Sequence, residues 1–349
     1  MSTFVCAHDN DFSAIAAGGI MGITIKEIAE LCGVSQGTVD RALNHRPGIS
    51  EKTKKKILAV ASERNYRPDP VARSLARGRT MTIGVVLFDL YNRSFSQLMN
   101  AIEMSSREAG YYVHLMLTNK DPDNEKKCIE HLIHRKVDGI ILFPINEGPE
   151  FDQYLRMLNI PIVTICNKVS DHWRYVGIDD RQAMKDAMDY VCRKGYERFI
   201  YVCPPLAYKG RTNIFTQEER FAGCLQGLRD NGITEQPIVI DTPAYVEALS
   251  GIDFRSAPKT AVVCSCDIYA LEVMNHLKER GLRIPEDVGV IGFDNIDVLK
   301  YVAPRLTTVE YAVEQFGERA VRDIVGQIET GGSEHIPLLP YRIIAGSSI

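Results

Sequence analysis

The stretch TIKEIAELCGVSQGTVDRALN, residues 24–44, decides how the first part of the chain folds. Thr24 is followed three residues later by Glu27, which is the capping-box pattern at the start of a helix. Apolar residues then recur with helical spacing, at Ile25, Ile28, Ala29 and Leu31. Gly33 comes next, where a left-handed backbone ends a helix most easily. We therefore predict a short first helix that ends in a tight turn.

A second short helix follows the turn, with Ser35 as its N-cap. Its apolar residues are expected to face the first helix: Val39, Ala42 and Leu43. The residues on its outer side are polar or small: Gln36, Gly37, Thr38, Arg41 and Asn44. Two helices joined in this way form a helix-turn-helix, whose second helix lies in the major groove of DNA. The pattern therefore indicates double-stranded DNA as a partner.

More helices are predicted after the helix-turn-helix. A third helix begins after the N-cap Ser50, and the segment RPDP at 67–70 ends it. Asp69 and Pro70 have the N-cap and first-turn positions of another short helix, residues 71–76. A buried strand begins at residue 82.

These segments together resemble the LacI/GalR family of transcriptional regulators. The resemblance covers residues 22–349. It rests on residues 24–44, on RPGISEKTKKKILAVASERNYRPDPVARSLARGRTMTIGVV at 46–86, and on EDVGVIGFDN at 286–295 and PRLTTVE at 304–310. It implies an all-α helix-turn-helix headpiece and a hinge helix, joined to an α/β, two-lobed, periplasmic-binding-protein-like effector domain with parallel sheets.

Charge is distributed unevenly along the chain. Residues 22–80 contain 12 Lys and Arg against 6 Asp and Glu, whereas the whole chain has a formal net charge of −4. A basic region attached to an acidic body concentrates the attraction for DNA at one end of the protein.

Cysteine usage and hydropathy indicate a reducing, aqueous compartment. The nine Cys are scattered and odd in number, so no disulfide framework is implied. Cys264 and Cys266 lack a second cluster with ligand spacing, so we expect no metal and no cofactor. No run approaches the roughly 20 apolar residues of a membrane span. We expect a bacterial cytoplasmic, nucleoid-associated protein, and take residues 1–21 as a disordered extension or an upstream start codon assigned in error.

Strand and helix patterns alternate after residue 81, which indicates parallel sheets with helices on both faces. Two such sets indicate two lobes. We assign the headpiece, the hinge and the effector domain to residues 22–69, 70–80 and 81–349. The lobes are assigned to residues 81–178 with 309–336, and to residues 179–308 with 337–349. The resemblance implies three chain crossings between them, near residues 177–180, 306–310 and 337–341.

Ligands of open α/β sheets bind beyond the carboxyl ends of the strands. This rule selects residues that follow the predicted strands: Asn92, Arg93, Phe95, Asn167, Cys266, Asp267 and Asp294. It also selects Arg220, on a helix that begins near the cleft. The resemblance implies that the Arg of an R-x-x-G motif, Arg220, and the Asp after a G-[YF] pair, Asp294, bind the effector. Carboxylates and Arg suit sugars because they form directional, charge-assisted hydrogen bonds to hydroxyls.

Several of these residues have structural alternatives. Asp294 would also serve as the N-cap of a helix at residues 295–302, and Arg220 as one half of a surface or interlobe salt bridge. Arg93 either meets a phosphate or carboxylate of the effector or points to solvent. Trp173, the single Trp, either stacks on a ligand ring or packs within the protein, and packing is favoured.

The helix-turn-helix offers two kinds of DNA contact, since phosphate contacts position a protein and base contacts specify sequence. The phosphate contacts are assigned to Thr24, Ser35, Thr38, Asn44 and Thr53. The base contacts are assigned to Gln36, Gly37 and Arg41, because Gln pairs with adenine and Arg with guanine in the major groove. Asp40 adds a negative charge that would orient Arg41 or cap the helix locally.

In the family that the chain resembles, the hinge helix inserts a Leu into the minor groove. Leu75 matches this wedge, with Ala76 beside it. Such a wedge exchanges a few kcal/mol of base unstacking for a bent and better-contacted duplex. Two hinge helices must pack together, which implies a homodimer and a near-palindromic operator.

We expect a sequence-specific DNA-binding transcriptional regulator, a repressor, whose operator affinity is controlled by a sugar or sugar derivative bound between the lobes. The alternative is a solute-binding protein of a sugar uptake system, against which the headpiece argues. An enzyme is not expected, because no G-x-S-x-G motif, phosphate loop or metal-binding His pair is present in the sequence.

Overall fold

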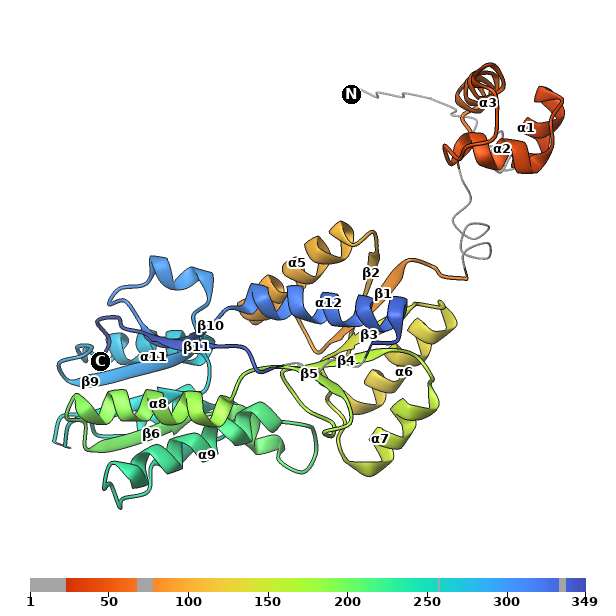
Figure 1. Cartoon of the computed structure of the whole chain (residues 1–349). Helices are drawn as coiled ribbons and strands as arrows, with labels where there is room; N and C mark the ends of the chain where they lie inside the picture. Colours follow the sequence, from red (N-terminus) through yellow and green to blue (C-terminus); the bar gives the residue numbers. More distant parts are fainter. Residues whose placement is uncertain (1–22, 68–77, 257, 333–336) are drawn as a thin grey trace, which may run out of the picture. The chain divides into compact units, whose positions relative to one another are not determined.

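The computed structural model describes residues 23–67, 78–256, 258–332 and 337–349. The chain divides into two compact units, Met1–Gly78 and Arg79–Ile349, which we call the headpiece and the body (Figure 1). The expected hinge wedge, Leu75 and Ala76, lies outside the described residues, as do residues 1–21 and 70–77.

The headpiece contains the three expected helices, α1 (Ile25–Cys32), α2 (Gln36–Leu43) and α3 (Glu51–Glu63). Each begins at a hydroxyl N-cap, and Gly33 ends α1 with a left-handed φ of 66°. The three helices share one small core, formed by Ile28, Ala29, Cys32, Val39, Ala42, Ile57 and Ala61.

The prediction that Leu31 lies on the apolar face of α1 is wrong. Leu31 is 52 % exposed, and Cys32 is buried in its place. The core face of α1 passes through residues 28, 29 and 32, and residue 31 lies about 100° away from residue 32 around the helix axis.

The first lobe of the body is a five-stranded parallel sheet in the order β2-β1-β3-β4-β5. Its strands are β1 (Thr82–Leu87), β2 (Tyr112–Leu117), β3 (Gly139–Leu142), β4 (Ile162–Ile165) and β5 (Arg174–Val176). Its helices are α5 (Arg93–Glu108), α6 (Pro122–His134), α7 (Gly148–Met157) and α12 (Val313–Thr330). Helices α5 and α12 pack on one face and α6 and α7 on the other, because alternate strand residues join two different core clusters.

The second lobe is a six-stranded sheet in the order β11-β10-β9-β8-β6-β7, parallel except for β11. Its strands are β6 (Arg198–Val202), β7 (Ile238–Ile240), β8 (Thr260–Cys264), β9 (Val288–Asp294), β10 (Thr307–Tyr311) and β11 (Tyr341–Ile344). Its helices are α8 (Asp180–Arg193), α9 (Phe215–Asp230), α10 (Tyr245–Ser250) and α11 (Asp267–Glu279), with short 3-10 turns η2 (Pro204–Tyr208) and η3 (Asp297–Tyr301). The expected fold class, a helical headpiece followed by a two-lobed α/β body, is confirmed for the described residues.

The chain crosses between the lobes three times (Figure 1). The first crossing separates β5 from α8, and the third precedes β11, where the Leu339 amide donates to the Gly177 carbonyl at 2.8 Å. The second crossing lies at Ala312, after the expected segment 306–310, so the expected lobe boundary at residue 309 is too early. All of β10 belongs to the second sheet, because it pairs with both β9 and β11.

Candidate functional site

Arg220 lies at the centre of the body, where α9 faces the crossings between the lobes. Its side chain is 6 % exposed. Its Nε donates to Asp180 Oδ1 at 2.8 Å, and its Nη1 donates to the Ser265 carbonyl at 2.6 Å. The guanidinium carbon is 3.7 Å from the centroid of the Phe293 ring, which is a cation–π distance. Arg220 therefore forms a buried salt bridge within the second lobe, which differs from the surface or interlobe salt bridge expected as its structural alternative.

Asp294 completes this cluster from the carboxyl end of β9. Its Oδ1 lies 3.4 Å from Arg220 Nη1 and accepts a 2.9 Å hydrogen bond from the Tyr311 hydroxyl. Its backbone has a φ of 122°, a conformation that is unfavourable for a residue with a Cβ atom. Such strain persists only where surrounding contacts impose it, and it is typical of ligand sites.

The charges of this cluster influence one another in a dry environment. Burial raises the pKa of Asp180 to about 6, against the opposing effect of Arg220. Burial likewise raises the pKa of Asp294 above its ordinary value. Burial opposes the charge of Arg220, but Asp180 and Asp294 outweigh it and hold the Arg220 pKa above its usual value. The cluster thus combines one guanidinium with two carboxylates that are costly to ionise.

Cys266 and Asp267 lie next to this cluster but have internal partners. Asp267 is fully buried, and its carboxylate accepts hydrogen bonds from the Thr308 hydroxyl at 2.6 Å and the Ile296 amide at 3.0 Å. Cys266 is the residue before α11, and burial raises its thiol pKa well above the ordinary value. Asp267 therefore ties β10 to the segment after β9, next to Asp294.

Asn167 joins the two lobes on one side of the Arg220 cluster. Its Nδ2 donates to the Asn213 carbonyl at 2.8 Å and the Pro144 carbonyl at 3.2 Å, and its Oδ1 accepts from the Thr216 amide at 3.2 Å. Asn213 also bonds to the first lobe, because its backbone amide donates to the Ile145 carbonyl at 2.6 Å. We call these contacts the Asn167 clasp. Its residues come from the loops after β3 and β4 in one lobe and before α9 in the other.

Arg93 joins the lobes elsewhere, which differs from its expected place beside the effector. Its guanidinium pairs with both carboxylate oxygens of Asp297, each at 2.8 Å, and its side chain is 51 % exposed. Gln97, one turn further along α5, accepts from the Asp297 amide at 3.4 Å. Arg93 starts α5, so its side chain projects into a groove between α5 and α12 and not towards Arg220. Asn92 acts as the N-cap of α5 and accepts from the Ser94 amide at 3.2 Å.

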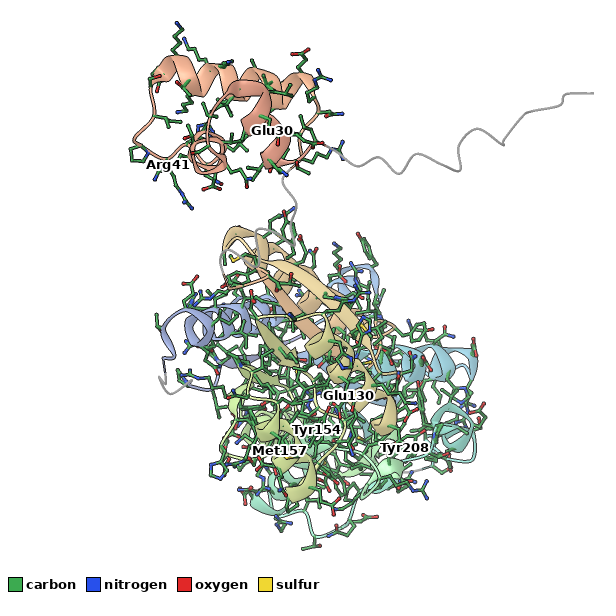
Figure 2. The ribbon with its side chains drawn as sticks, turned by 90° about the vertical axis from the view of Figure 1, so that its right-hand side faces the viewer. Glu30, Arg41, Glu130, Tyr154, Met157 and Tyr208 are labelled. Atoms are coloured by element: carbon green, nitrogen blue, oxygen red, sulfur yellow. The ribbon has the colours of Figure 1, made fainter. Side chains whose placement is uncertain are left out.

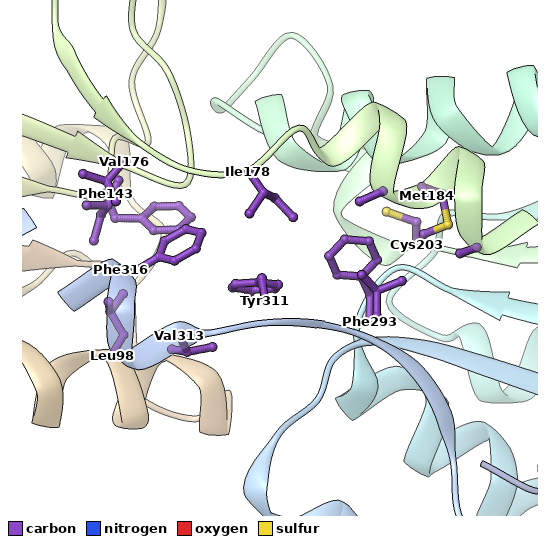
Figure 3. Close-up of a cluster of buried hydrophobic side chains, with 14 of the residues drawn as sticks. Leu98, Phe143, Val176, Ile178, Met184, Cys203, Phe293, Tyr311, Val313 and Phe316 are labelled. Atoms are coloured by element: carbon purple, nitrogen blue, oxygen red, sulfur yellow. The ribbon is translucent and has the colours of Figure 1, made fainter. Parts of the chain in front are cut away.

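Aromatic side chains form the wall of the first lobe. Phe95 packs edge-to-face on Phe88 at 4.5 Å and on Phe143 at 5.3 Å between ring centroids. Figure 3 shows Phe143 and Phe316 in one lobe, Phe293 in the other, and Tyr311 between them. Trp173 is remote from this wall: its Nε1 donates to Asp152 at 2.7 Å and it packs against the core beneath α7, which agrees with the favoured packing role.

The headpiece presents its expected base contacts to solvent. Gln36, Gly37 and Arg41 are exposed on α2, and the Arg41 side chain extends away from the helices (Figure 2). Within residues 23–67, the side chains of Gln36 and Arg41 have no hydrogen-bond or ion-pair partner. Asp40 does not orient Arg41: it accepts from Asn44 Nδ2 at 2.8 Å and lies 3.4 Å from Arg46.

Four of the five expected phosphate contacts have capping roles at helix starts, and the fifth, Asn44, is the C-cap residue of α2. Thr24 completes the capping box with Glu27, and Ser35 and Thr38 share a 2.9 Å hydrogen bond at the start of α2. Thr53 and its N-cap Ser50 share a similar bond of 2.8 Å. These hydroxyls lie at helix N-termini, where backbone amides favour anions, so capping is compatible with a phosphate contact.

Sequence patterns missed two members of the Arg220 cluster, Asp180 and Tyr311. Asp180 begins α8 directly after the first crossing, and Tyr311 ends β10 directly before the second. Their positions beside predicted crossings were an available signal, because both crossings border the cleft.

A small helical unit that exposes a recognition helix, joined to a two-lobed body with a buried polar cluster between its lobes, defines a ligand-responsive class of DNA-binding regulator. Comparisons with known proteins give the same class. Residues 24–69 match "Bacterial regulatory proteins, lacI family" and residues 188–349 match "Periplasmic binding protein-like domain". The HTH-type transcriptional regulator RegA of Clostridium acetobutylicum is 33 % identical, over 94 % of this chain and 99 % of that protein. The chain belongs to the lacI family of bacterial transcriptional regulators and is a DNA-binding regulator.

Solved structures show the same architecture. The Lac repressor dimer bound to operator and the anti-inducer ONPF matches with a TM-score of 0.80 and 24 % identity, covering 93 % of this chain and 98 % of that chain. A periplasmic binding protein/LacI transcriptional regulator from Alkaliphilus metalliredigens, complexed with D-xylulofuranose, matches with a TM-score of 0.66 and 26 % identity, covering 77 % of this chain and 98 % of that chain. No helix among the described residues combines the length and hydropathy needed to cross a membrane.

Proposed function

We propose that this chain is a repressor that binds a near-palindromic operator as a homodimer, and that a sugar or sugar derivative bound between its lobes controls operator affinity. The observation that carries the proposal is the buried ion pair of Arg220, on α9, with Asp294, at the carboxyl end of β9. Buried charges in a protein interior are paired or functional, and this pair lies beside two of the crossings: Asp180, bonded to Arg220, follows the first, and Tyr311, bonded to Asp294, precedes the second.

The geometry couples the site to the lobe arrangement. Tyr311 contacts Asp294, and the next residue, Ala312, is the crossing to α12. The Asn167 clasp and the pair of Arg93 with Asp297 also join the lobes. A ligand that changes the contacts of Asp294 therefore changes the relative stability of two lobe arrangements, and DNA affinity shifts by that coupling free energy, typically about 1–3 kcal/mol.

The relatives support the sugar assignment. The Alkaliphilus regulator was solved with D-xylulofuranose, and its body aligns with this one. A solute-binding role is not favoured, because the curated relatives that extend over most of the chain are transcriptional regulators. The proposed operator contacts remain those of Gln36, Gly37 and Arg41.

The DNA part of the proposal is tested by selecting sequences from a random duplex library with the full chain. We expect a near-palindromic site. Arg41→Ala should weaken binding to that site by about tenfold or more, since a bidentate base contact contributes about 1–3 kcal/mol of discrimination. Arg107→Ala, which removes an equal charge from α5 in the body, is the control and should leave Kd unchanged. Equal effects of the two changes would remove Arg41 from the base contacts.

The effector part is tested by measuring operator affinity with and without each sugar of a broad panel. A sugar that shifts the operator affinity of the wild type should not shift the operator affinity of Asp294→Asn. Asparagine can adopt the same backbone conformation but lacks the carboxylate. Operator affinity of this variant without sugar should stay within about twofold, because Asp294 lies in the body and not in the DNA-contacting unit. A normal sugar response by the variant would place the effector elsewhere.

A further inference from the structure

The positive charge at the proposed effector site is already shared between two carboxylates. Arg220 pairs with Asp180 at 2.8 Å and with Asp294 at 3.4 Å, and it also donates to the Ser265 carbonyl. A guanidinium that is to bind a phosphate or carboxylate of a ligand must have a free fork of donors. The positive charge of Arg220 is therefore already balanced by Asp180 and Asp294 before a ligand binds.

Other cations near the strand ends are also engaged. Both carboxylate oxygens of Asp297 accept from Arg93, and Lys120 lies 3.1 Å from Asp89 and over the Phe88 ring. Lys168 lies over the rings of Tyr175 and Phe215, at 5.0 and 5.6 Å from their centroids, and 3.7 Å from Asp171. None of these three cations contacts the Arg220 cluster among the described residues.

Acidic groups outnumber basic groups at the site. Asp180, Asp294 and Asp267 are all at most 4 % exposed, against the single guanidinium of Arg220. Adding a second anion to such a dry, acid-rich cluster costs both its own desolvation and repulsion from the carboxylates. A hydroxyl has no such cost, because it donates to Asp294 and accepts from Arg220.

The charged groups beside the aromatic residues of the first lobe are already paired with each other, since Lys120 pairs with Asp89 next to Phe88. The first lobe contributes a cluster of Phe88, Phe95 and Phe143. Figure 3 shows Phe316 beside Phe143. An aromatic wall of this kind packs against the C–H face of a sugar ring. The polar wall of the second lobe and the aromatic wall of the first together fit a ring with hydroxyls and one apolar face.

We propose that the effector of this regulator is a sugar or polyol without a negatively charged group, and that the double pairing of Arg220 by Asp180 and Asp294 excludes sugar phosphates and sugar acids. This inference rests on the proposed function, because it takes the Arg220 cluster as the effector site. It adds that the regulator senses the free sugar, so the reaction that supplies the effector is uptake or hydrolysis without phosphorylation, and not the action of a sugar kinase.

The test compares matched probes that differ only in charge. The thermal unfolding midpoint of the full chain is measured with D-glucose, D-glucose 6-phosphate and D-glucuronate, with the corresponding galactose series, and with D-ribose and D-xylulose beside their 5-phosphates. We expect at least one neutral sugar to raise the midpoint by about 5 °C at a hundredfold excess over Kd, while its charged partners give no shift. Potassium phosphate at the same concentration controls for ionic strength.

A pair of variants tests the reason for the exclusion. Asp180→Asn leaves Arg220 with one carboxylate partner, so the affinity for the charged relative of the bound sugar should rise at least about tenfold relative to the neutral sugar. Asp189→Asn is the matched control: it removes the same charge from α8, where Asp189 pairs with Lys185 at 3.1 Å, away from Arg220. This control should keep the selectivity of the wild type.

The outcomes separate this inference from the proposed function. If a sugar phosphate or sugar acid binds the wild type more tightly than its neutral parent and shifts operator affinity, the inference is overturned while the proposed function stands. Equal selectivity in Asp180→Asn and Asp189→Asn would also overturn it, because the pairing of Arg220 would then not control ligand charge. The wild-type comparison decides the matter even if Asp180→Asn does not fold.

Discussion

At the scale of the residue, Glu125 is a buried acid that organises a loop at the edge of the cleft. It lies on α6, is fully buried, and accepts from the Ile145 and Asn146 amides at 2.8 Å and from Asn146 Nδ2 at 2.7 Å. The Ile145 carbonyl in turn accepts from Asn213 of the Asn167 clasp. Burial raises the pKa of Glu125 to about 7, although the Asn146 donors oppose this shift.

This pKa gives the stability of the body a predicted pH dependence. The carboxyl binds protons more tightly in the folded state, so the free energy of unfolding should fall as the pH rises from about 4.5 to about 7, by up to about 3 kcal/mol. Glu125→Gln should lose this part of the slope, while the parts that come from the buried Asp180 and Asp294 remain. The variant should also be less stable by about 1–3 kcal/mol, because an amide group cannot accept from all three donors. Urea unfolding from pH 5 to pH 8 measures both effects.

Glu130→Gln supplies the control for this prediction. Glu130 lies on the same helix and is exposed (Figure 2), so its removal should leave the pH slope unchanged. The assignment to Glu125 fails if its variant retains the slope of the wild type.

Which site residues could be predicted depended on whether a motif or the strand-end rule selected them. Arg220 and Asp294 were selected by their motifs and by the strand-end rule, and the structure brings them within 3.4 Å. Asp180 and Tyr311 were not, because neither residue belongs to a recognised motif, and their contacts with Arg220 and Asp294 are fixed only by packing. The same rule selected Arg93 on its proximity to a strand end, but the side chain of a residue at a helix start has several directions available.

At the scale of the element, α12 approaches α5 closely enough to require a glycine. A Cβ atom added at Gly317 would lie 2.7 Å from Ala101 Cβ and 2.9 Å from the Ile102 amide nitrogen. Gly326, on the same helix, has open space at the Cβ position. The two glycines therefore form a natural pair for comparison.

Alanine should have opposite effects at these two positions. Gly317→Ala should destabilise the body by about 1–3 kcal/mol, since the two helices must separate. Gly326→Ala should stabilise it by about 0.5–1 kcal/mol, because alanine loses less backbone entropy in a helix. The midpoints of urea unfolding give both values. Destabilisation of similar size at both sites would contradict the close packing of α5 and α12.

The headpiece offers a second glycine pair. Gly33 has a φ of 66° at the end of α1, whereas Gly37 is helical, and a Cβ atom added there would have only the Ser35 hydroxyl within 4 Å, at 3.9 Å. Gly33→Ala should lower the stability of the headpiece by about 1–2 kcal/mol, and Gly37→Ala should raise it by about 0.5–1 kcal/mol. Far-ultraviolet circular dichroism during heating measures the change. A neutral Gly33→Ala would show that α1 ends without the left-handed turn.

The helices and strands were predictable where local signals agreed. The hydroxyl N-caps Thr24, Ser35 and Ser50 placed three helix starts, because each cap satisfies backbone amides that have no other partner. The lobe to which β10 belongs was not predictable in this way. Its apolar pattern fits either sheet, and its pairing with β9 and β11 is decided by strands far away in the sequence.

At the scale of the whole molecule, the two units have separate cores. The headpiece core consists of residues of α1, α2 and α3, and the core clusters of the body contain only residues from position 81 onwards. We therefore expect two transitions in calorimetry of the full chain. Gly33→Ala should lower only the smaller transition and Gly317→Ala only the larger, because neither residue contacts the other core. A single transition that both variants lower equally would show that the units unfold together.

If Arg220 and Asp294 bind the effector as proposed, their internal pairing also sets the concentration range in which this regulator would respond. A hydroxyl of the ligand would then have to displace the Tyr311 hydroxyl from Asp294 and the partners of Arg220. These groups are part of the protein, so they compete with the ligand at a high effective concentration. Each bond gained is offset by a bond lost, and the net affinity comes mainly from the apolar face of the ligand. On the proposed assignment the site would discriminate by shape and would fill only at high ligand concentrations, so the regulator would respond to the abundance of a metabolite and not to traces of it.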